Sequence, residues 1–439
     1  MLKSKFIRDK NYLLLFFGNL TSGIGSRVYG FGISLYLLDL TGSATATAIY
    51  FAVWTVIMFV CSPIAATFTD RFKYKAKVLY LTDFGRGVCY GLAAVIMTLA
   101  INHGQAIVIQ TVIYTMVFFI AIQTAFFAPA VNALTPQIVE KEELVSASSI
   151  MQITHSIQNL AGLFFGALLY LHFGIVVLII INAVSFFLSA ISEMFIKVDE
   201  ETLEGTYETK GKDKKNLKDI AQQVKGDLKT AIIYLFKQAK PILMIMIIIL
   251  LSATLVTPWF SIGVPYMFKE YFTFTVFEPE YLLASSNFIE SVGIILMSLV
   301  VSQIAFRFKI FQILRFGGVI FFFLSVFNLI IIMSLDREII QQHTFIVLFL
   351  AFSFIAGLVN ATINAPINAS LYKYIDKKVI GKVSTLINSI SGIFYPITAI
   401  VAGYLIDYVN FYIPLYIAIF AMFLLTMICL KSKNLQKLA

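Results

Sequence analysis

Two apolar halves flank one long charged segment in this chain. The segment runs from Lys197 to Lys240 and carries ten of the 33 Lys and Arg residues, so the core of a bilayer cannot hold it. A bilayer core about 30 Å thick takes about 20 apolar residues per helix. We therefore expect several membrane-spanning helices on each side of the segment.

The composition supports this interpretation. Hydrophobic residues make up 59% of the chain and charged residues 13%, whereas soluble domains carry about 25% charged residues. We predict an all-α integral membrane protein with 12 transmembrane helices in two six-helix bundles. The expected spans are 12–38, 45–69, 78–101, 104–129, 143–171, 174–196, 242–268, 281–306, 311–334, 343–371, 379–406 and 411–430.

Three parts of the chain follow from these spans. Residues 1–196 form the predicted N-terminal bundle, 197–240 a cytoplasmic linker and 241–439 the C-terminal bundle. From Leu217 to Leu235 the linker has apolar residues every three or four positions, which predicts an amphipathic helix. Two interpretations remain open: a helix on the membrane surface, or one packed on the cytoplasmic ends of its neighbours.

The basic residues indicate the orientation. If both termini are cytoplasmic, the tails and inside loops hold all Lys and Arg except Arg27, Arg86, Lys269 and Arg337. Basic residues are enriched in the cytoplasmic loops of membrane proteins, and this positive-inside bias accounts for the net charge of +9. We therefore expect no nucleic-acid partner. The excess of Ile, Lys, Phe and Asn favours a low-GC bacterium and hence its plasma membrane.

No catalytic or nucleotide-binding motif is found in the sequence. It lacks a Gly-rich phosphate loop, a Gly-x-Ser-x-Gly elbow, and His and Cys at metal-binding spacing. Cys61, Cys89 and Cys429 fall inside expected spans, where they serve as small packing residues. We expect no cofactor, no metal and no enzyme activity.

An internal repeat relates the two halves. A shift of 237 residues superimposes Pro129 on Pro366 and Gly166 on Gly403, and brings together two basic loops. Parallel repeats of six spans predict a transporter whose site lies between the halves near mid-membrane. Without an ATP motif, an ion gradient must drive it.

The loop after the second span carries a family resemblance. Residues 66–75 read Ala-Thr-Phe-Thr-Asp-Arg-Phe-Lys-Tyr-Lys, and Asp70, Arg71 and Lys75 match the signature loop of the major facilitator superfamily, which this chain resembles. The resemblance implies that the loop acts as a conformational latch. Its usual glycines are replaced, so the loop is degenerate.

The resemblance extends over nearly the whole chain. Leu40 to Ala44, Phe127 to Pro129 and Glu143-Leu144 are similar to the drug-efflux and siderophore-export branch, which includes macrolide exporters. The fifth span adds a polar and small face that includes Asn159, Gly162 and Gly166. Gly162 and Gly166 match part of the antiporter glycine motif, and with Gly403 we expect them to allow close helix packing.

Charges inside the spans suggest the coupling chemistry. Arg27 and Glu290 lie well within the first and eighth spans, where an unpaired charge costs roughly 2.5 to 3.5 kcal/mol. One hypothesis places both in an aqueous cavity, with Glu290 exchanging a proton. The alternative is a fixed structural ion pair.

Further candidates have two interpretations each. Asp83 and Arg86 share one face of the third span, and pairing with each other or with the Asp70 loop is favoured over substrate contact. His155, Trp54 and Trp259 are either substrate contacts or packing residues. Asn360 and Asn364 form a polar stripe suited to a cavity wall or to interhelical packing.

We therefore expect a secondary active transporter, in the leading interpretation a proton-coupled antiporter that exports an amphipathic small molecule. Drugs of macrolide type, a multidrug range or siderophores are the candidate substrates. The alternative is a lipid or lipid-precursor flippase on the same fold, and a membrane-embedded enzyme or scaffold is the least favoured interpretation. Six-plus-six transporters commonly act as single chains, so a monomer is expected.

Overall fold

A computed structural model describes most of the chain. The described residues are 9–72, 74–140, 143–198, 226, 229–230, 232–237, 239–304, 310–375, 380–432 and 435. Inside the helices some side chains, among them those of Asp70 and Arg71, fall outside this description. So do Leu217, Ile220, Val224 and Leu228, on which most of the predicted amphipathic linker helix rests.

The chain divides into two compact units. The first comprises Met1–Leu40 with Val53–Gln222, and the second Thr41–Ala52 with Gln223–Ala439. The short stretch Thr41–Ala52 lies within the range expected for the N-terminal bundle, yet it packs with the second unit. The predicted boundaries at 196 and 241 stay a prediction.

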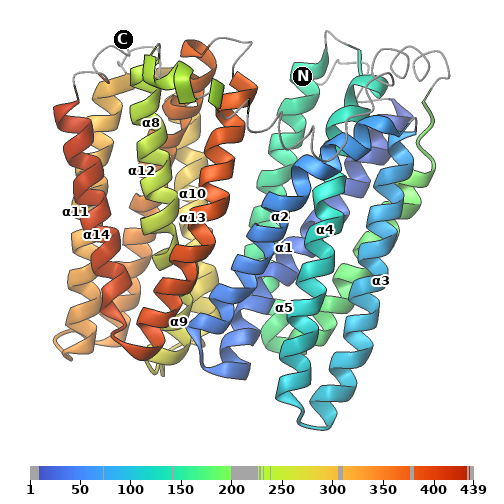
Figure 1. Ribbon diagram of the computed structural model, residues 1–439. Coiled ribbons are helices and arrows are strands. Elements are labelled where there is room, and N and C mark those ends of the chain that lie inside the picture. The colour runs from blue at the N-terminus through green and yellow to red at the C-terminus, as the bar shows by residue number, and fades with distance from the viewer. Residues whose placement is uncertain are drawn as a thin grey trace. The chain divides into compact units, whose positions relative to one another are not determined.

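Helices that run nearly parallel make up the first unit (Figure 1). They are α1 (Lys10–Thr41), α2 (Ala44–Arg71, whose first turns belong to the second unit), α3 (Lys75–Asn102), α4 (Ala106–Ile138) and α5 (Leu144–Met194). Helices of this length satisfy their backbone hydrogen bonds internally, as a bilayer requires. In α5 the helix breaks at Gly174, with φ 72° and ψ 177°, which is the first residue of the second of the two spans expected there.

The regular elements described in the second unit are also all helices. Its elements are α8 (Lys240–Leu251), η3 (Ser252–Val256), η4 (Trp259–Gly263), α9 (Val264–Tyr266), η5 (Met267–Tyr271), α10 (Pro279–Ile304), α11 (Ile310–Asp336), α12 (Gln342–Tyr374), α13 (Ile380–Tyr408) and α14 (Tyr412–Lys431). The elements η3, η4 and η5 are π-helical turns within the continuous helical stretch Lys240–Tyr271. Pro258 and Pro265 lie in the same stretch. A proline lacks a backbone N–H donor, which favours a local change from α-helical to π-helical turns.

Helix bounds follow the internal repeat closely. Shifting α4 by 237 residues predicts a helix at 343–375, and α12 spans Gln342–Tyr374. The same shift takes α5 from Leu144 to 381, and α13 starts at Ile380. Corresponding elements of the two halves therefore start within a residue of each other at these positions.

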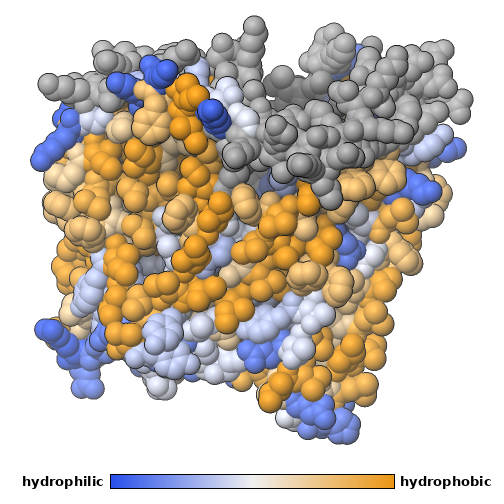
Figure 2. Space-filling model, in the orientation of Figure 1, coloured by the Kyte–Doolittle hydropathy of each residue, from blue (hydrophilic) through white to orange (hydrophobic). Residues whose placement is uncertain are grey.

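Long apolar helices dominate the structure. Within the described residues nine helices are long and apolar enough to cross a membrane, and the stretch Ile157–Met194 counts as one of them although it contains the break at Gly174. On the face shown in Figure 2, hydrophobic side chains cover the middle of the helices and hydrophilic ones gather toward the ends. This is a multi-pass membrane protein, and the count of twelve spans stays a prediction.

Glycines let the helices approach closely. In the first unit, a Cβ added at Gly162 would lie 2.3 Å from the Cβ of Arg27, and one at Gly166 would lie 2.9 Å from that of Phe31. In the second unit, a Cβ at Gly403 would lie 2.8 Å from the Cα of Thr45. Only glycine fits at contacts this short, so these positions set the distance between helices.

Candidate functional site

A buried group of charged side chains lies in the first unit. Asp83 and Arg86, one turn apart on α3, form an ion pair, and Arg86 Nε also donates to the carbonyl of Thr82 at 3.4 Å. Asp83 is fully buried and Arg86 is 6% exposed. The three-residue spacing brings both side chains to the same face of α3.

Two aromatic rings hold the guanidinium of Arg86. Its Cζ lies 4.5 Å from the ring centroid of Phe127 on α4 and 4.5 Å from that of Phe186 on α5. A guanidinium over an aromatic face gains from the ring quadrupole, and more so when it is desolvated. Arg86 is therefore fixed by Asp83 on one side and by two rings.

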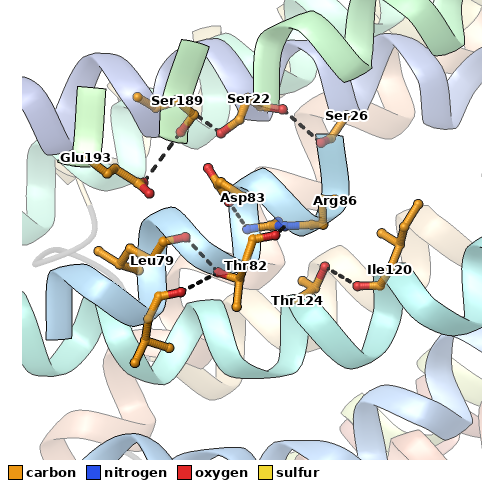
Figure 3. A network of polar contacts seen from close by, with 12 residues as sticks. Ser22, Ser26, Leu79, Thr82, Asp83, Arg86, Ile120, Thr124, Ser189 and Glu193 are labelled. Carbon is orange, nitrogen blue, oxygen red and sulfur yellow. Dashed lines mark hydrogen bonds and ion pairs between the residues drawn. The ribbon is translucent and has the colours of Figure 1, made fainter. Parts of the chain in front are cut away.

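A second carboxyl group, which sequence reasoning missed, faces this ion pair from α5. Glu193 is fully buried, and its Oε1 lies 3.5 Å from Oγ of Ser189, one turn earlier. The hydroxyl of Ser189 also lies close enough to the Asp83 carboxylate to stabilise its charge. Figure 3 shows Asp83 and Glu193 pointing into the same space between α3 and α5. We call Asp83, Arg86 and Glu193 the charged triad.

Polar side chains also join α1 and α5. Nε2 of the buried Gln158 donates to the carbonyl and to Oδ1 of Asn19, at 2.8 Å and 3.1 Å. Because its Nε2 is the donor, Oε1 of Gln158 accepts from Nδ1 of His155, 3.1 Å away. The predicted candidate His155 is thus bonded along its own helix, and Asn159, one position after Gln158, is exposed.

The candidates in the second unit lie next to one another. Nδ2 of Asn364 donates to Oδ1 of Asn360 on α12, and the amide of Asn360 is close enough to stabilise the carboxylate of Glu290 on α10. Glu290 is half-buried, and this described neighbour is a neutral amide.

The close approach of α10 and α12 places Glu290. A Cβ at Gly357 would lie 2.1 Å from the carbonyl oxygen of Glu290, and one at Gly293 would lie 2.5 Å from the carbonyl oxygen of Phe354. Both glycines therefore keep the backbones in contact. The Glu290 backbone is fixed against α12, and its side chain meets Asn360 there.

The remaining candidates have different surroundings. Arg27 is exposed on α1 and Trp54 is half-buried on α2. Trp259 is 1% exposed and packs against Phe411 with ring centroids 5.3 Å apart. The buried Lys75 of the predicted latch loop donates from Nζ to the carbonyl of Thr69, so it ties the end of α2 to the start of α3.

Within the described part of the chain, no three His, Cys, Asp or Glu side chains lie close enough together to hold a metal ion. The arrangement is instead one of ionisable groups inside apolar helices, which is typical of ion and substrate pathways through membranes.

Long apolar helices of this kind, with charged and amide side chains between them, define a polytopic membrane protein. Residues 15–337 match the family model of the Major Facilitator Superfamily. The chain belongs to that superfamily.

Curated relatives match part of the chain. It is 28% identical over 198 residues to the uncharacterized MFS-type transporter YkuC of Bacillus subtilis, covering 44% of this chain and 43% of that protein. It is 25% identical over 181 residues to macrolide efflux protein A of Streptococcus pyogenes, covering 41% and 43%. The chain thus matches less than half the length of these relatives.

Solved structures share the fold over almost the whole chain. A bacterial homologue of the iron transporter ferroportin in an inward-facing state has a TM-score of 0.70 at 14% identity, covering 96% of this chain and 98% of that one. The nucleoside transporter NupG has a TM-score of 0.66 at 13% identity, covering 96% and 100%. At these identities the likeness shows the fold alone.

Proposed function

We propose that this chain is a proton-coupled secondary transporter that exports an amphipathic small molecule from a bacterial cell by alternating access. The observation that carries the proposal is Glu290, a carboxyl group within a membrane span whose described partner is the neutral Asn360. A carboxylate in that position is costly unless it is paired or protonated. Binding and releasing a proton there links the site to the proton gradient.

The gradient supplies enough free energy for this work. Moving one charge across the membrane yields about 2.3 kcal/mol per 100 mV, and a pH difference adds to it. The protein sits in the plasma membrane with both termini cytoplasmic, so protons enter as substrate leaves. A cavity shared by Arg27 and Glu290, the latch role of Asp70 and Arg71, and action as a monomer stay predictions.

The substrate class is proposed from similarity. One relative is named a macrolide efflux protein, and large amphipathic compounds suit an apolar cavity with few polar groups. We therefore propose macrolide-like drugs first and siderophores second. Trp54, Asn159, Asn360 and Asn364 are the proposed wall residues.

A variant of Glu290 tests the coupling. Glu290→Gln keeps a polar side chain of the same size beside Asn360 but cannot exchange a proton, so we expect drug movement driven by a pH gradient in vesicles to fall to the level of empty vesicles. Glu278→Gln, an exposed position before α10, is the matched control and keeps wild-type transport. Unchanged transport in Glu290→Gln would rule out Glu290 as the coupling group.

A growth panel tests the substrate. Cells that lack the chain are compared with cells that express it, across macrolides, other drugs and iron-limited medium. Lost drug resistance supports drug export, and a defect in low iron supports siderophore export. A defect confined to the cell envelope would instead favour a lipid flippase.

A further inference from the structure

The charged triad of the first unit carries an unbalanced charge. Two carboxyl groups, of Asp83 and Glu193, face one guanidinium, that of Arg86. All three side chains are more than nine-tenths buried. Among the described residues, the other groups that contact them are neutral: Thr82 on α3, Gly18 on α1, Ser189 on α5, and the rings of Phe127 and Phe186.

Two carboxylate oxygens of the triad lack a donor. Within the described residues, neither Oδ2 of Asp83 nor Oε2 of Glu193 has a hydrogen-bond partner. Both oxygens are buried, and a buried carboxylate without donors is strongly disfavoured. The site is therefore short of hydrogens as well as short of positive charge.

Ser189 offers a partner for such a proton. Its Oγ lies 3.5 Å from Oε1 of Glu193, and its hydroxyl is also near the Asp83 carboxylate. A hydroxyl has one hydrogen and can donate it to one carboxylate only. If Glu193 carries a proton, that proton is donated to Ser189 Oγ, and the hydrogen of Ser189 can then turn toward Asp83.

We propose that the charged triad is a proton-binding site, in which one proton resides on Glu193 and bonds to Ser189 while Asp83 remains ionised and paired with Arg86. Binding converts the Glu193 carboxylate and a proton from water into a neutral carboxylic acid. The triad then has no net charge. This inference deepens the proposed function, on which its role in coupling rests, by adding a second proton site in the other unit from Glu290.

A sodium ion would balance the charge equally well, yet the geometry favours the proton. Arg86 already lies against Asp83, and a metal cation between the carboxyl groups would be repelled by its guanidinium. A sodium ion also needs several oxygen ligands, whereas a proton needs only the Ser189 hydroxyl as its partner.

Infrared spectroscopy of the full chain in lipid nanodiscs tests the proposal without any substrate. At neutral pH we expect the wild type to show the carbonyl band of a protonated carboxyl that disappears in Glu193→Gln. In Ser189→Ala the same band shifts, because its hydrogen bond is lost. Glu280→Gln is the matched control, since Glu280 is buried and ion-paired with Lys269, and it leaves the band unchanged.

Thermal unfolding gives a second readout. The folded wild type holds a proton that unfolded Glu193 gives up at neutral pH, so its melting temperature falls as the pH rises from about 6 to about 9. Glu193→Gln mimics the protonated acid, so it folds, and we expect a smaller fall over this range.

Two results would overturn the proposal. One is a wild-type infrared spectrum and pH profile identical to those of Glu193→Gln. The other is a band that is lost when sodium replaces choline in the buffer, which would make the triad a sodium site. Neither result touches the transport assay of Glu290→Gln, so the two proposals fail separately.

Discussion

Glu193, which is buried, and Glu290, which is half-buried, are two acids with different partners. Glu290 meets a chain of neutral amides through Asn360, whereas Glu193 shares Arg86 with Asp83. Protonation of Glu290 would remove a negative charge beside neutral amides. Protonation of Glu193 would leave the triad neutral, because Asp83 and Arg86 then carry one negative and one positive charge. The same residue type therefore serves two different proposed steps.

Gly357 of α12, which packs against the backbone of Glu290, gives a prediction for a single residue. In Gly357→Ala the new Cβ overlaps the carbonyl oxygen of Glu290 at 2.1 Å, so α10 must shift, at a cost of about 1 to 3 kcal/mol. Thermal unfolding in nanodiscs measures the loss. Gly91→Ala, where nothing lies within 4 Å of the added Cβ, is the control, and equal melting temperatures for the two variants would contradict this packing.

Sequence reasoning finds charged residues that interrupt apolar runs, and it therefore singled out Asp83, Arg86 and Glu290. It passed over Glu193, because this residue lies near the charged linker and looks like part of the membrane interface. It also passed over Asn19 and Gln158, since an uncharged amide inside an apolar run gives little signal. Partners depend on how helices are rotated, which a pattern along one chain does not specify.

At the scale of elements, the start of α2 is capped by a residue far away in sequence. The carboxylate of Asp407, near the end of α13, accepts from the backbone N–H groups of Ala44 and Thr45, each at 2.9 Å. Oγ of Ser43 donates to it at 2.6 Å and accepts from the N–H of Ala46. A carboxylate here satisfies unpaired donors and complements the helix dipole.

Removing this cap should loosen α2. Asp407→Ala is expected to cost about 0.5 to 2 kcal/mol of stability, measured by thermal unfolding. Asp407→Asn keeps an oxygen acceptor and should recover most of the loss. An Asp407→Ala protein that melts at the wild-type temperature would show that the cap contributes nothing.

The break in α5 gives a second prediction for an element. Gly174 has φ 72° and ψ 177°, a region that residues with a Cβ avoid, so Gly174→Ala should cost about 1 to 3 kcal/mol. Gly30→Ala, at a helical position with open space around the added Cβ, should leave the stability unchanged or raise it by about 0.5 to 1 kcal/mol. Equal unfolding temperatures for the two variants would show that a side chain at position 174 does not strain the backbone.

The positions of most helices are predictable from the sequence, because a run of about 20 apolar residues has the length that a bilayer core requires. The expected span 379–406 corresponds to α13, Ile380–Tyr408. The expected end at Pro129 was too early, since α4 continues to Ile138 with Pro129 inside it. Neighbouring helices can compensate a proline within a membrane, so it is a weak stop signal there. The cap by Asp407 joins residues more than 360 positions apart, which no local pattern reports.

At the scale of the whole molecule, the internal repeat and the family match both indicate the same two-half helical architecture. The shift of 237 residues relates helix bounds in both halves, and the Major Facilitator Superfamily model covers residues 15–337. In the proposed mechanism each unit contributes one acid inside its helices, Glu193 in the first and Glu290 in the second. The proposed coupling therefore involves both units of the chain.

Substrate-driven proton movement in vesicles tests this central claim most directly. Purified chain is placed in proteoliposomes that enclose a pH-sensitive dye, under a pH gradient, with the drug identified by the growth panel. We predict that adding the drug speeds the collapse of the gradient with the wild type and not with Glu290→Gln. Drug movement that continues at the same rate after a protonophore has abolished the gradient would contradict the claim.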